Sequence, residues 1–292
     1  MDWKLSLAGL LVGLLVGMTG MGGGSLMTPL LVLLFGFKPS VAIGTDIVHG
    51  AIFKSFGAVQ HRRLGHVHAR LVAWMLLGSA PFSIVGVTLA WWLKKHYGDG
   101  YEDTAKQILG ISLVLCGAGF LIKSFLHSAP EDKPLILTTR DRWVAFLTGV
   151  VGGFVVGLTS VGSGTLFGLV MLIAFPLTAA KIVGTDIFQA ALLLWVAGVG
   201  HMVIGSVDYH ATGWLLIGSI PGVLIGGRLT VSLPDKALRI ALASTLTLSG
   251  IKLIDPPYGD DIVIVGAVAA GVAAVVATVR WLVARRLVAE SP

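Results

Sequence analysis

The chain has 292 residues, of which 55% are hydrophobic and 12% charged, and its mean hydropathy is +0.89. Soluble domains average about 25% charged residues, so this composition excludes a soluble globular protein and indicates a polytopic membrane protein. The single cysteine, Cys116, excludes an internal disulfide and a multi-cysteine metal site. The net charge of +6 would suit an anionic partner, but membrane proteins also gather Lys and Arg in their cytoplasmic loops.

The first apolar run, 5–35, is broken at its centre by Gly17-Met18-Thr19-Gly20-Met21-Gly22-Gly23-Gly24-Ser25-Leu26. Glycine is unfavourable inside a helix, and unpaired backbone groups are more unfavourable still in lipid. Such a break is therefore expected only against protein or a water-lined cavity. The run has no small-residue cleavage site, so we expect it to be retained and not removed as a signal peptide.

Further apolar segments follow the first broken run and then repeat its plan. They are expected at 41–61, 69–93 and 106–127, then at a second broken run, 143–175, and at 181–204, 212–232, 236–254 and 262–284. We divide the chain into a first transmembrane repeat (1–128), a polar linker (129–142), a second transmembrane repeat (143–255) and an additional C-terminal transmembrane helix (262–286). The predicted fold is all-α.

The two halves are related by a duplication with a constant offset of 140 residues. Residues 17–86 and 157–226 share 21 identities in 70 positions, including the Gly-Thr-Asp of residues 44–46 and 184–186. Shared Leu or Val would mean little in so apolar a chain, whereas shared Gly, Thr, Asp, His, Trp and Pro indicate duplication. Paired, glycine-interrupted apolar segments point to the binding site of a transporter.

The charges of the loops predict how the repeats are oriented. Loop 61–70 is basic, its equivalent 201–210 has no Lys or Arg, loop 255–261 is acidic, and the C-terminus is rich in Arg. The positive-inside rule places loop 61–70 and the C-terminus in the cytoplasm. Both placements hold only if each broken run enters and returns, which gives inverted repeats, two re-entrant or otherwise even-pass elements and seven full crossings. About fifteen residues on each side of a break make about 20 Å of helix, which reaches the middle of the bilayer.

The broken turns combine glycines with hydroxyl side chains. A helix that begins at residues 22–25 offers free N–H groups and a positive dipole end, which together make an anion site. The candidate substrate-binding residues are Thr19, Gly22, Gly23, Gly24 and Ser25 in the first turn, and Thr159, Ser160, Gly162, Ser163, Gly164 and Thr165 in the second. The alternative is that the glycines only allow close helix packing.

Ionisable residues inside apolar segments are the second group of candidates. Thr45-Asp46 and Thr185-Asp186 lie about one turn from their segment starts, so they either cap or brace the scaffold or couple transport to protons or Na⁺. His49 and Lys54 lie deeper, where the second repeat has Gln189 and Leu194. Lys54 either neutralises an anionic substrate or extends to the cytoplasmic headgroups. We count His49, Lys54 and Gln189 among the candidate substrate-binding residues.

Motifs for catalysis and ATP use are absent from the sequence. There is no H-E-x-x-H, no G-x-S-x-G and no G-x-x-x-x-G-K-[ST]. An intramembrane enzyme would need a nucleophile and a base, or paired carboxylates, in one cavity. Asp46 and Asp186 could in principle form such a pair, but their place on the repeated scaffold, near helix starts, argues against it. We therefore expect no enzyme, no cofactor and no metal site.

These residues resemble the TauE/SafE family of membrane anion transporters, also described as sulfite exporters. The resemblance rests on Gly17 to Leu26 with Gly44-Thr45-Asp46, and on Gly157 to Leu166 with Gly184-Thr185-Asp186. It implies transport without ATP, often export, of sulfite, sulfonates or related small anions. Ser160 and Ser163 replace Gly20 and Gly23, so the two half-sites differ, which suits an asymmetric sulfonate as well as sulfite.

From these observations we expect a secondary transporter that exports a small sulfur oxyanion or organosulfonate, such as sulfite or sulfoacetate, by alternating access. It would lie in the cytoplasmic (inner) membrane as a multi-pass protein. Its partners would be the sulfur-containing anion and the lipid bilayer, with a homodimer left open and no nucleic acid. The alternatives are an uncoupled anion channel and, more distantly, an intramembrane enzyme.

Overall fold

Helix is the only regular secondary structure in the part of the chain that the computed structural model describes, residues 2–19, 23–126, 135–229, 235–259, 261 and 263–266. The elements are α1 (Asp2–Thr19), α2 (Gly23–Leu33), α3 (Pro39–Arg63), α4 (Ala69–Tyr97), the 3₁₀ turn η1 (Gly98–Gly100), α5 (Tyr101–Phe125), α6 (Thr139–Thr159), α7 (Leu166–Ala174), α8 (Ala179–Ile204), α9 (Tyr209–Leu229) and α10 (Asp235–Ile254). The predicted all-α class is confirmed.

Five of these helices are long and apolar enough to cross a membrane: α4, α5 over Tyr101–Ile122, α6, α8 and α9. They confirm the predicted polytopic membrane protein. α3 is also long, but Asp46, His49 and Lys54 lower its hydropathy. The predicted last segment, 262–284, lies almost wholly outside the described residues, as does the C-terminus.

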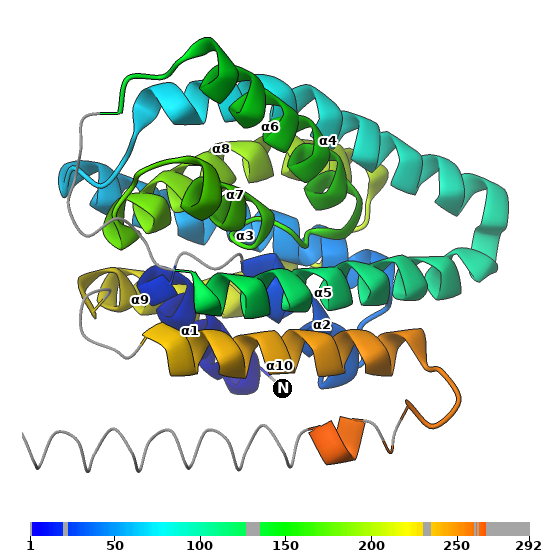
Figure 1. Ribbon diagram of the computed structural model, residues 1–292. Coiled ribbons are helices and arrows are strands. Elements are labelled where there is room, and N and C mark those ends of the chain that lie inside the picture. The colour runs from blue at the N-terminus through cyan, green and yellow to red at the C-terminus, as the bar shows by residue number, and fades with distance from the viewer. Residues whose placement is uncertain are drawn as a thin grey trace, which may run out of the picture.

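The helices pack in pairs, and adding or subtracting 140 residues converts each pair into an equivalent pair or into itself. α1 packs on α9 and α6 on α4, while α3 packs on α8 and α5 on α10. In Figure 1 the α4–α6 pair lies above α3 and α8, and the α1–α9 pair lies below them. The first and last elements of one half therefore pack on elements of the other half, so neither half is a separate body.

Glycines make the α1–α9 and α4–α6 contacts close. Gly9, Gly13 and Gly17 lie against the backbone of Leu215, Ser219 and Val223, and Gly149, Gly153 and Gly157 lie against Met75, Ser79 and Ser83. The residue numbers of the second set of contacts differ from those of the first by 140 at every position. A Cβ at any of these glycines would overlap the backbone of the opposite helix. Of the glycines in the two broken turns, Gly17 and Gly157 therefore pack against a neighbouring helix.

Equivalent helices of the two halves run antiparallel. In the α3–α8 pair, Gly44 lies against Ser206 and Gly184 against His66, so the start of each helix meets the loop after the other. In the α5–α10 pair, Gly110 lies against Ile254 while Gly117 lies against Thr247. The loops after α3 and α8 consequently lie at opposite ends of the molecule.

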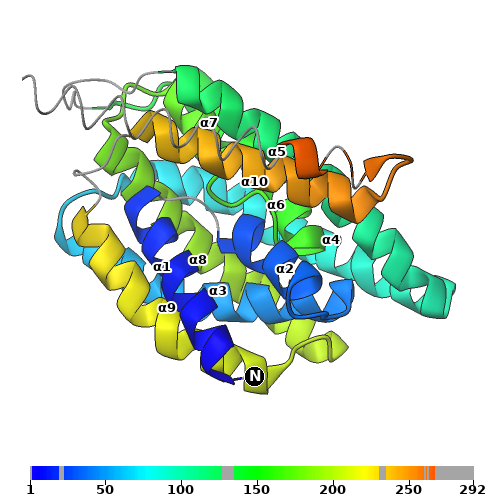
Figure 2. The same ribbon diagram turned by 90° about the horizontal axis from the view of Figure 1, so that it is seen from below.

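The first broken run turns back on itself. α1 is parallel to α9 through the glycine contacts, and α9 is parallel to α3 because Asp208 bonds Thr45 while Ser219 contacts His49. α2 is antiparallel to α3, since its start lies against Phe53 and its Thr28 against Asp46. Figure 2 shows α2 leaving the end of α1 in the reverse direction.

The arms of the broken runs are less equal than the sequence predicted. α1 has 18 residues and α6 has 21, about 27 and 32 Å of helix, whereas α2 has 11 and α7 has 9. α6 begins at Thr139, before the predicted boundary, because Thr138 and Asp141 form a capping box that adds a turn from the polar linker. The first arm of each run is therefore long enough to cross most of the bilayer.

Candidate functional site

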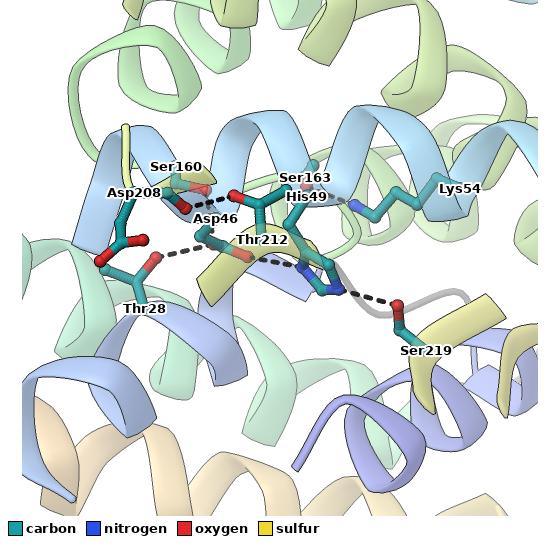
Figure 3. A network of polar contacts seen from close by, with 9 residues as sticks. All are labelled: Thr28, Asp46, His49, Lys54, Ser160, Ser163, Asp208, Thr212 and Ser219. Atoms are coloured by element: carbon teal, nitrogen blue, oxygen red, sulfur yellow. Dashed lines mark hydrogen bonds and ion pairs between the residues drawn. The ribbon is translucent and has the colours of Figure 1, made fainter. Parts of the chain in front are cut away.

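Asp46 of α3 connects the two broken elements. Its Oδ2 accepts hydrogen bonds from Thr28 Oγ1 of α2 and from Ser160 Oγ at the second break, both at 2.7 Å. Gly24, in the first turn of α2, lies directly against the backbone of Ser160. Figure 3 shows the carboxylate between the two hydroxyls. A buried carboxyl group therefore accepts from two hydroxyl donors at the point where the two broken elements meet.

The equivalent carboxylate, Asp186, has different surroundings. The positions equivalent to Thr28 and Ser160 are Gly168 and Gly20, which carry no hydroxyl. Asp186 is 2% exposed and, with Asp46, attracts the Lys54 ammonium. The duplication therefore repeats the carboxylate but not its donors.

Lys54 lies in the interior, with 1% of its surface exposed. Its Nζ donates to Ser163 Oγ at 3.0 Å, and its stem passes Gly23 at the start of α2. The ammonium is directed at Ser163 in the second broken turn (Figure 3). Of the two alternatives for Lys54, this position suits neutralisation of an anion inside the protein.

His49 links α3 to α9 and faces Asp46. Its Nε2 lies 2.8 Å from Ser219 Oγ, and its Nδ1 lies 3.8 Å from Asp46 Oδ1. These two facing atoms have no hydrogen-bond partner among the residues described. Gln189 stands at the equivalent place in α8 and donates to Ser79 Oγ at 3.1 Å, so both halves join this position to the equivalent serine.

Thr45 and Thr185 hold loops from the other half. Thr45 Oγ1 accepts from the N–H of Asp208 at 2.9 Å, and Thr185 Oγ1 accepts from the N–H of His68 at 3.0 Å. Asp208 and His68 in turn accept from backbone N–H groups at the starts of α9 and α4. The alternative that the Thr-Asp pairs cap their own helices is wrong, because α3 begins at Pro39 and α8 is capped by Thr178.

The other predicted hydroxyls fall into different environments. Thr19 and Thr159 donate to carbonyls of Leu15 and Val155 in their own helices, and Thr165 donates to Cys116 on α5. The Ser25 hydroxyl is buried and has no partner within the described ranges. Among the described residues Ser25 therefore keeps an unpaired hydroxyl, whereas Thr159 and Thr165 complete the local structure.

The second broken turn is an irregular segment between α6 and α7. Ser160, Gly162 and Gly164 have φ of 64°, 116° and 88°. Glycine adopts this left-handed region without steric cost, which is why residues 162 and 164 are glycines. Gly23 and Gly24 begin α2, and Gly22 lies outside the described residues.

Three polar residues that contact the site were not predicted from the sequence. Ser79 and Ser219 carry a signal, because Gly-Ser-x-Pro is repeated at 78–81 and 218–221. Thr28 carries none, since its equivalent is Gly168 and it lies inside an apolar stretch. Among the described residues, no group of three or more His, Cys, Asp or Glu is placed to hold a metal ion.

The site is closed and nearly balanced in charge. Asp46, His49, Lys54 and Ser163 are each at most 1% exposed. With both carboxyl groups ionised and the Lys54 amine protonated, the cluster would carry a net charge of −1, and one further proton would bring it to zero. An anion added to the unprotonated cluster would raise the buried charge to −2, which is costly in a low dielectric.

Comparison with known proteins identifies the family. The model of the sulfite exporter TauE/SafE family matches residues 5–253, which covers both broken turns and every residue of the site. The chain belongs to the TauE/SafE family. The match ends before the predicted helix 262–286.

Relatives within the TauE/SafE family share most of the chain's length. The probable membrane transporter protein YjnA of Bacillus subtilis is 41% identical over 256 residues, which cover 87% of this chain and all of YjnA. YdhB of the same organism is 26% identical over 84% of this chain and 96% of its own length. MJ0441 of Methanocaldococcus jannaschii is 24% identical over 86% and 94%. All three are named probable membrane transporters, and no solved structure matches the chain.

Proposed function

We propose that this TauE/SafE protein is a secondary transporter that exports a small sulfur oxyanion or organosulfonate across the cytoplasmic membrane. The observation that carries the proposal is Lys54, a buried ammonium held by Ser163 where the two broken elements meet. A fully buried cation inside a membrane protein marks a substrate or ion pathway. The family's printed description, sulfite exporter, supports the sulfur oxyanion.

Groups from both halves would bind the anion. Ser163 and the Lys54 ammonium would supply donors from the second broken turn and from α3. The first turn of α2 would supply its N–H groups and the Ser25 hydroxyl. Sulfite and sulfonates present three oxygens around one sulfur, so they can accept from several such donors at once.

Alternating access by inverted repeats belongs to the same proposal. It is supported by the antiparallel course of the equivalent helices, by the return of α2 along α3 and by the burial of the site from both ends. Rocking of the α1–α9 and α4–α6 pairs about α3 and α8 would open the site to one side at a time.

Protons are the coupling ion that the charge balance favours over Na⁺. A proton on the Asp46–His49 pair would offset the charge of an incoming anion, and the two facing atoms, 3.8 Å apart, leave room for it. A monoanion that moves with one proton crosses without net charge, so net transport then follows the combined gradients of substrate and protons and does not depend on the membrane potential.

Thermal unfolding of the purified protein tests the site. We expect sulfite or one sulfonate from a panel of sulfite, sulfate, thiosulfate, taurine, sulfoacetate, isethionate and acetate to raise the apparent melting temperature. At 100 times Kd a ligand stabilises by about 2.7 kcal/mol. Lys54→Met should lose this ligand effect, while Lys95→Met, at the exposed end of α4, should keep it.

Two further results would separate the alternatives. If Lys54→Met does not fold, Ser163→Ala, which removes one donor and no charge, should still weaken binding. Equal stabilisation of wild type, Lys54→Met and Ser163→Ala would refute the site. In proteoliposomes a coupled transporter accumulates substrate when a proton gradient is imposed, whereas a channel only equilibrates it.

A further inference from the structure

A groove lies between the C-terminal halves of α3 and α9, away from the buried site. It encloses about 680 Å³ and has a polar part formed by Gln60, Arg63 and Arg228 and an apolar part that includes Phe56 and Val59. Gln60 Nε2 donates to the carbonyl of Leu224, which fixes that side chain across the two helices. Phe56 is 45% exposed and Val59 51%, so the apolar part is open on the outer surface of the helix bundle.

The second half has the equivalent groove, and its chemistry is different. It lies between α8 and α4, encloses about 300 Å³ and is lined by Val196, Gly200, Val203, Ile84 and Thr88 among others. These are the counterparts of Phe56, Gln60, Arg63, Leu224 and Arg228 under the 140-residue offset. The scaffold therefore makes a groove in each half, but only the first places two guanidinium groups in it.

The position of the arginines is not explained by helix chemistry alone. Basic residues in a last turn interact favourably with the helix dipole. Arg62 fulfils that role outside the groove, where its guanidinium lies 5.6 Å from the centre of the Phe188 ring. Arg63 and Arg228 come from different helices to one groove, and none of the described residues that line it is acidic. The two guanidinium groups therefore give the polar part of the groove a positive charge that would attract an anion.

We propose that this groove binds an anionic phospholipid. The phosphate would lie between Arg63 and Arg228, and an acyl chain would lie along Phe56 and Val59. Basic pockets between transmembrane helices bind anionic headgroups, and the exposed apolar wall beside this one suits a molecule with a hydrocarbon tail. Because α3 carries His49 and Lys54 and α9 carries Ser219, a bound lipid would stabilise the helix pair that holds one side of the buried site.

The test compares phosphatidylglycerol with phosphatidylcholine of the same acyl chains, using full-length protein in nanodiscs. We expect phosphatidylglycerol to raise the apparent melting temperature and to stay bound in native mass spectrometry. Arg63→Gln/Arg228→Gln should weaken that binding about 30-fold. The matched control, Arg62→Gln/Arg70→Gln, removes two exposed charges outside the groove and should bind like wild type.

A second variant separates a lipid from a free anion. Val59→Trp fills the apolar part and keeps both arginines, so it should also reduce phosphatidylglycerol binding. Equal binding by the Arg63→Gln/Arg228→Gln variant and its control would refute the proposal. Binding of soluble glycerol phosphate or sulfite that depends on the two arginines and survives Val59→Trp would also refute it, because the groove would then be an entrance for free anions. If the double glutamine variant does not fold, Val59→Trp alone decides between these outcomes.

Discussion

At the scale of single residues, the two halves differ where charge is concerned. The duplication preserves the carboxylate, the serine that contacts the side chain at position 49 or 189, and the threonine that binds a loop of the other half. It does not preserve the histidine, the lysine or the two hydroxyls that donate to Asp46. The two halves therefore share their scaffold. Each group that could bind an anion or balance its charge is present in only one of the two halves.

His49→Gln should remove the pH dependence of transport while preserving the fold. Gln189 already bonds Ser79 at the equivalent position, so a glutamine at 49 can bond Ser219. An imidazole can take up and release a proton during transport, whereas an amide cannot. The measurement is isethionate uptake by proteoliposomes at a series of pH values, because a sulfonate keeps its charge at all of them. His96→Gln, at an exposed position, is the control, and an unchanged pH profile for His49→Gln would contradict the role of the Asp46–His49 pair.

Asp46→Ala should destabilise the protein far more than Asp46→Asn. Alanine leaves the hydroxyls of Thr28 and Ser160 buried without their acceptor, at about 1–3 kcal/mol each, whereas the asparagine carbonyl can still accept from both. Thermal unfolding in detergent without ligand should therefore rank wild type and Asp46→Asn close together and Asp46→Ala well below. Equal melting temperatures for the two variants would mean that the hydroxyls do not depend on Asp46.

At the scale of elements, glycines shape the α1–α9 and α4–α6 helix pairs. The α1–α9 and α4–α6 contacts use backbone against backbone, so their geometry leaves no room for a side chain. Small residues give van der Waals contact between helices in lipid, where the hydrophobic effect contributes little. The same glycines that look like a break in the sequence thus include packing positions, such as 17 and 157, and turn positions, such as 162 and 164.

Gly13→Ala and Gly153→Ala should lower the melting temperature by similar amounts. Each added Cβ would overlap the backbone of a serine at equivalent places, Ser219 and Ser79, and force the helices apart. Gly213→Ala is the control, because that glycine lies in α9 with open space around it, and alanine should stabilise the helix by up to about 1 kcal/mol there. Tolerance of alanine at 13 and 153 would show that the helices can separate freely.

At the scale of the whole molecule, the exchange of helices between halves makes one integrated unit. The loops after α3 and α8 lie at opposite ends, with the basic groups Arg62, Arg63 and Arg228 at the end where α3 and α9 finish. The inverted topology that the loop charges predict requires these two loops to lie on opposite sides of the membrane. The membrane sides themselves are open to direct measurement.

Labelling of single cysteines should place the two loops on opposite sides. In a Cys116→Ser background, Leu64→Cys and Tyr209→Cys put thiols at positions that are 52% and 63% exposed. An impermeant maleimide added to intact cells should label position 209, and position 64 only after permeabilisation. Labelling of both positions in intact cells would contradict the inverted arrangement.

Much of the molecule follows from local pattern. Long apolar runs predict membrane helices, the 140-residue repeat predicts paired elements, and glycine clusters locate the breaks at Thr19 and Thr159. These features depend on a few neighbouring residues and on lipid as a solvent, so the amino-acid order is enough to find them. The burial of Asp46 and His49 follows in the same way from their place inside an apolar segment, whereas for Lys54 the sequence leaves both an internal position and the headgroups open.

The contacts of the site do not follow from local pattern. Asp46 bonds Ser160, 114 residues away, Lys54 bonds Ser163, 109 residues away, and His49 contacts Ser219, 170 residues away. The pairing of each hydroxyl with a charged group depends on how α1, α4, α6 and α9 of the two halves pack on one another. The periodicity of the sequence does not predict that packing. Thr45 and Thr185 illustrate the difference: their type suits a helix cap, but each binds the loop of the other half because the antiparallel α3–α8 pair brings that loop to it.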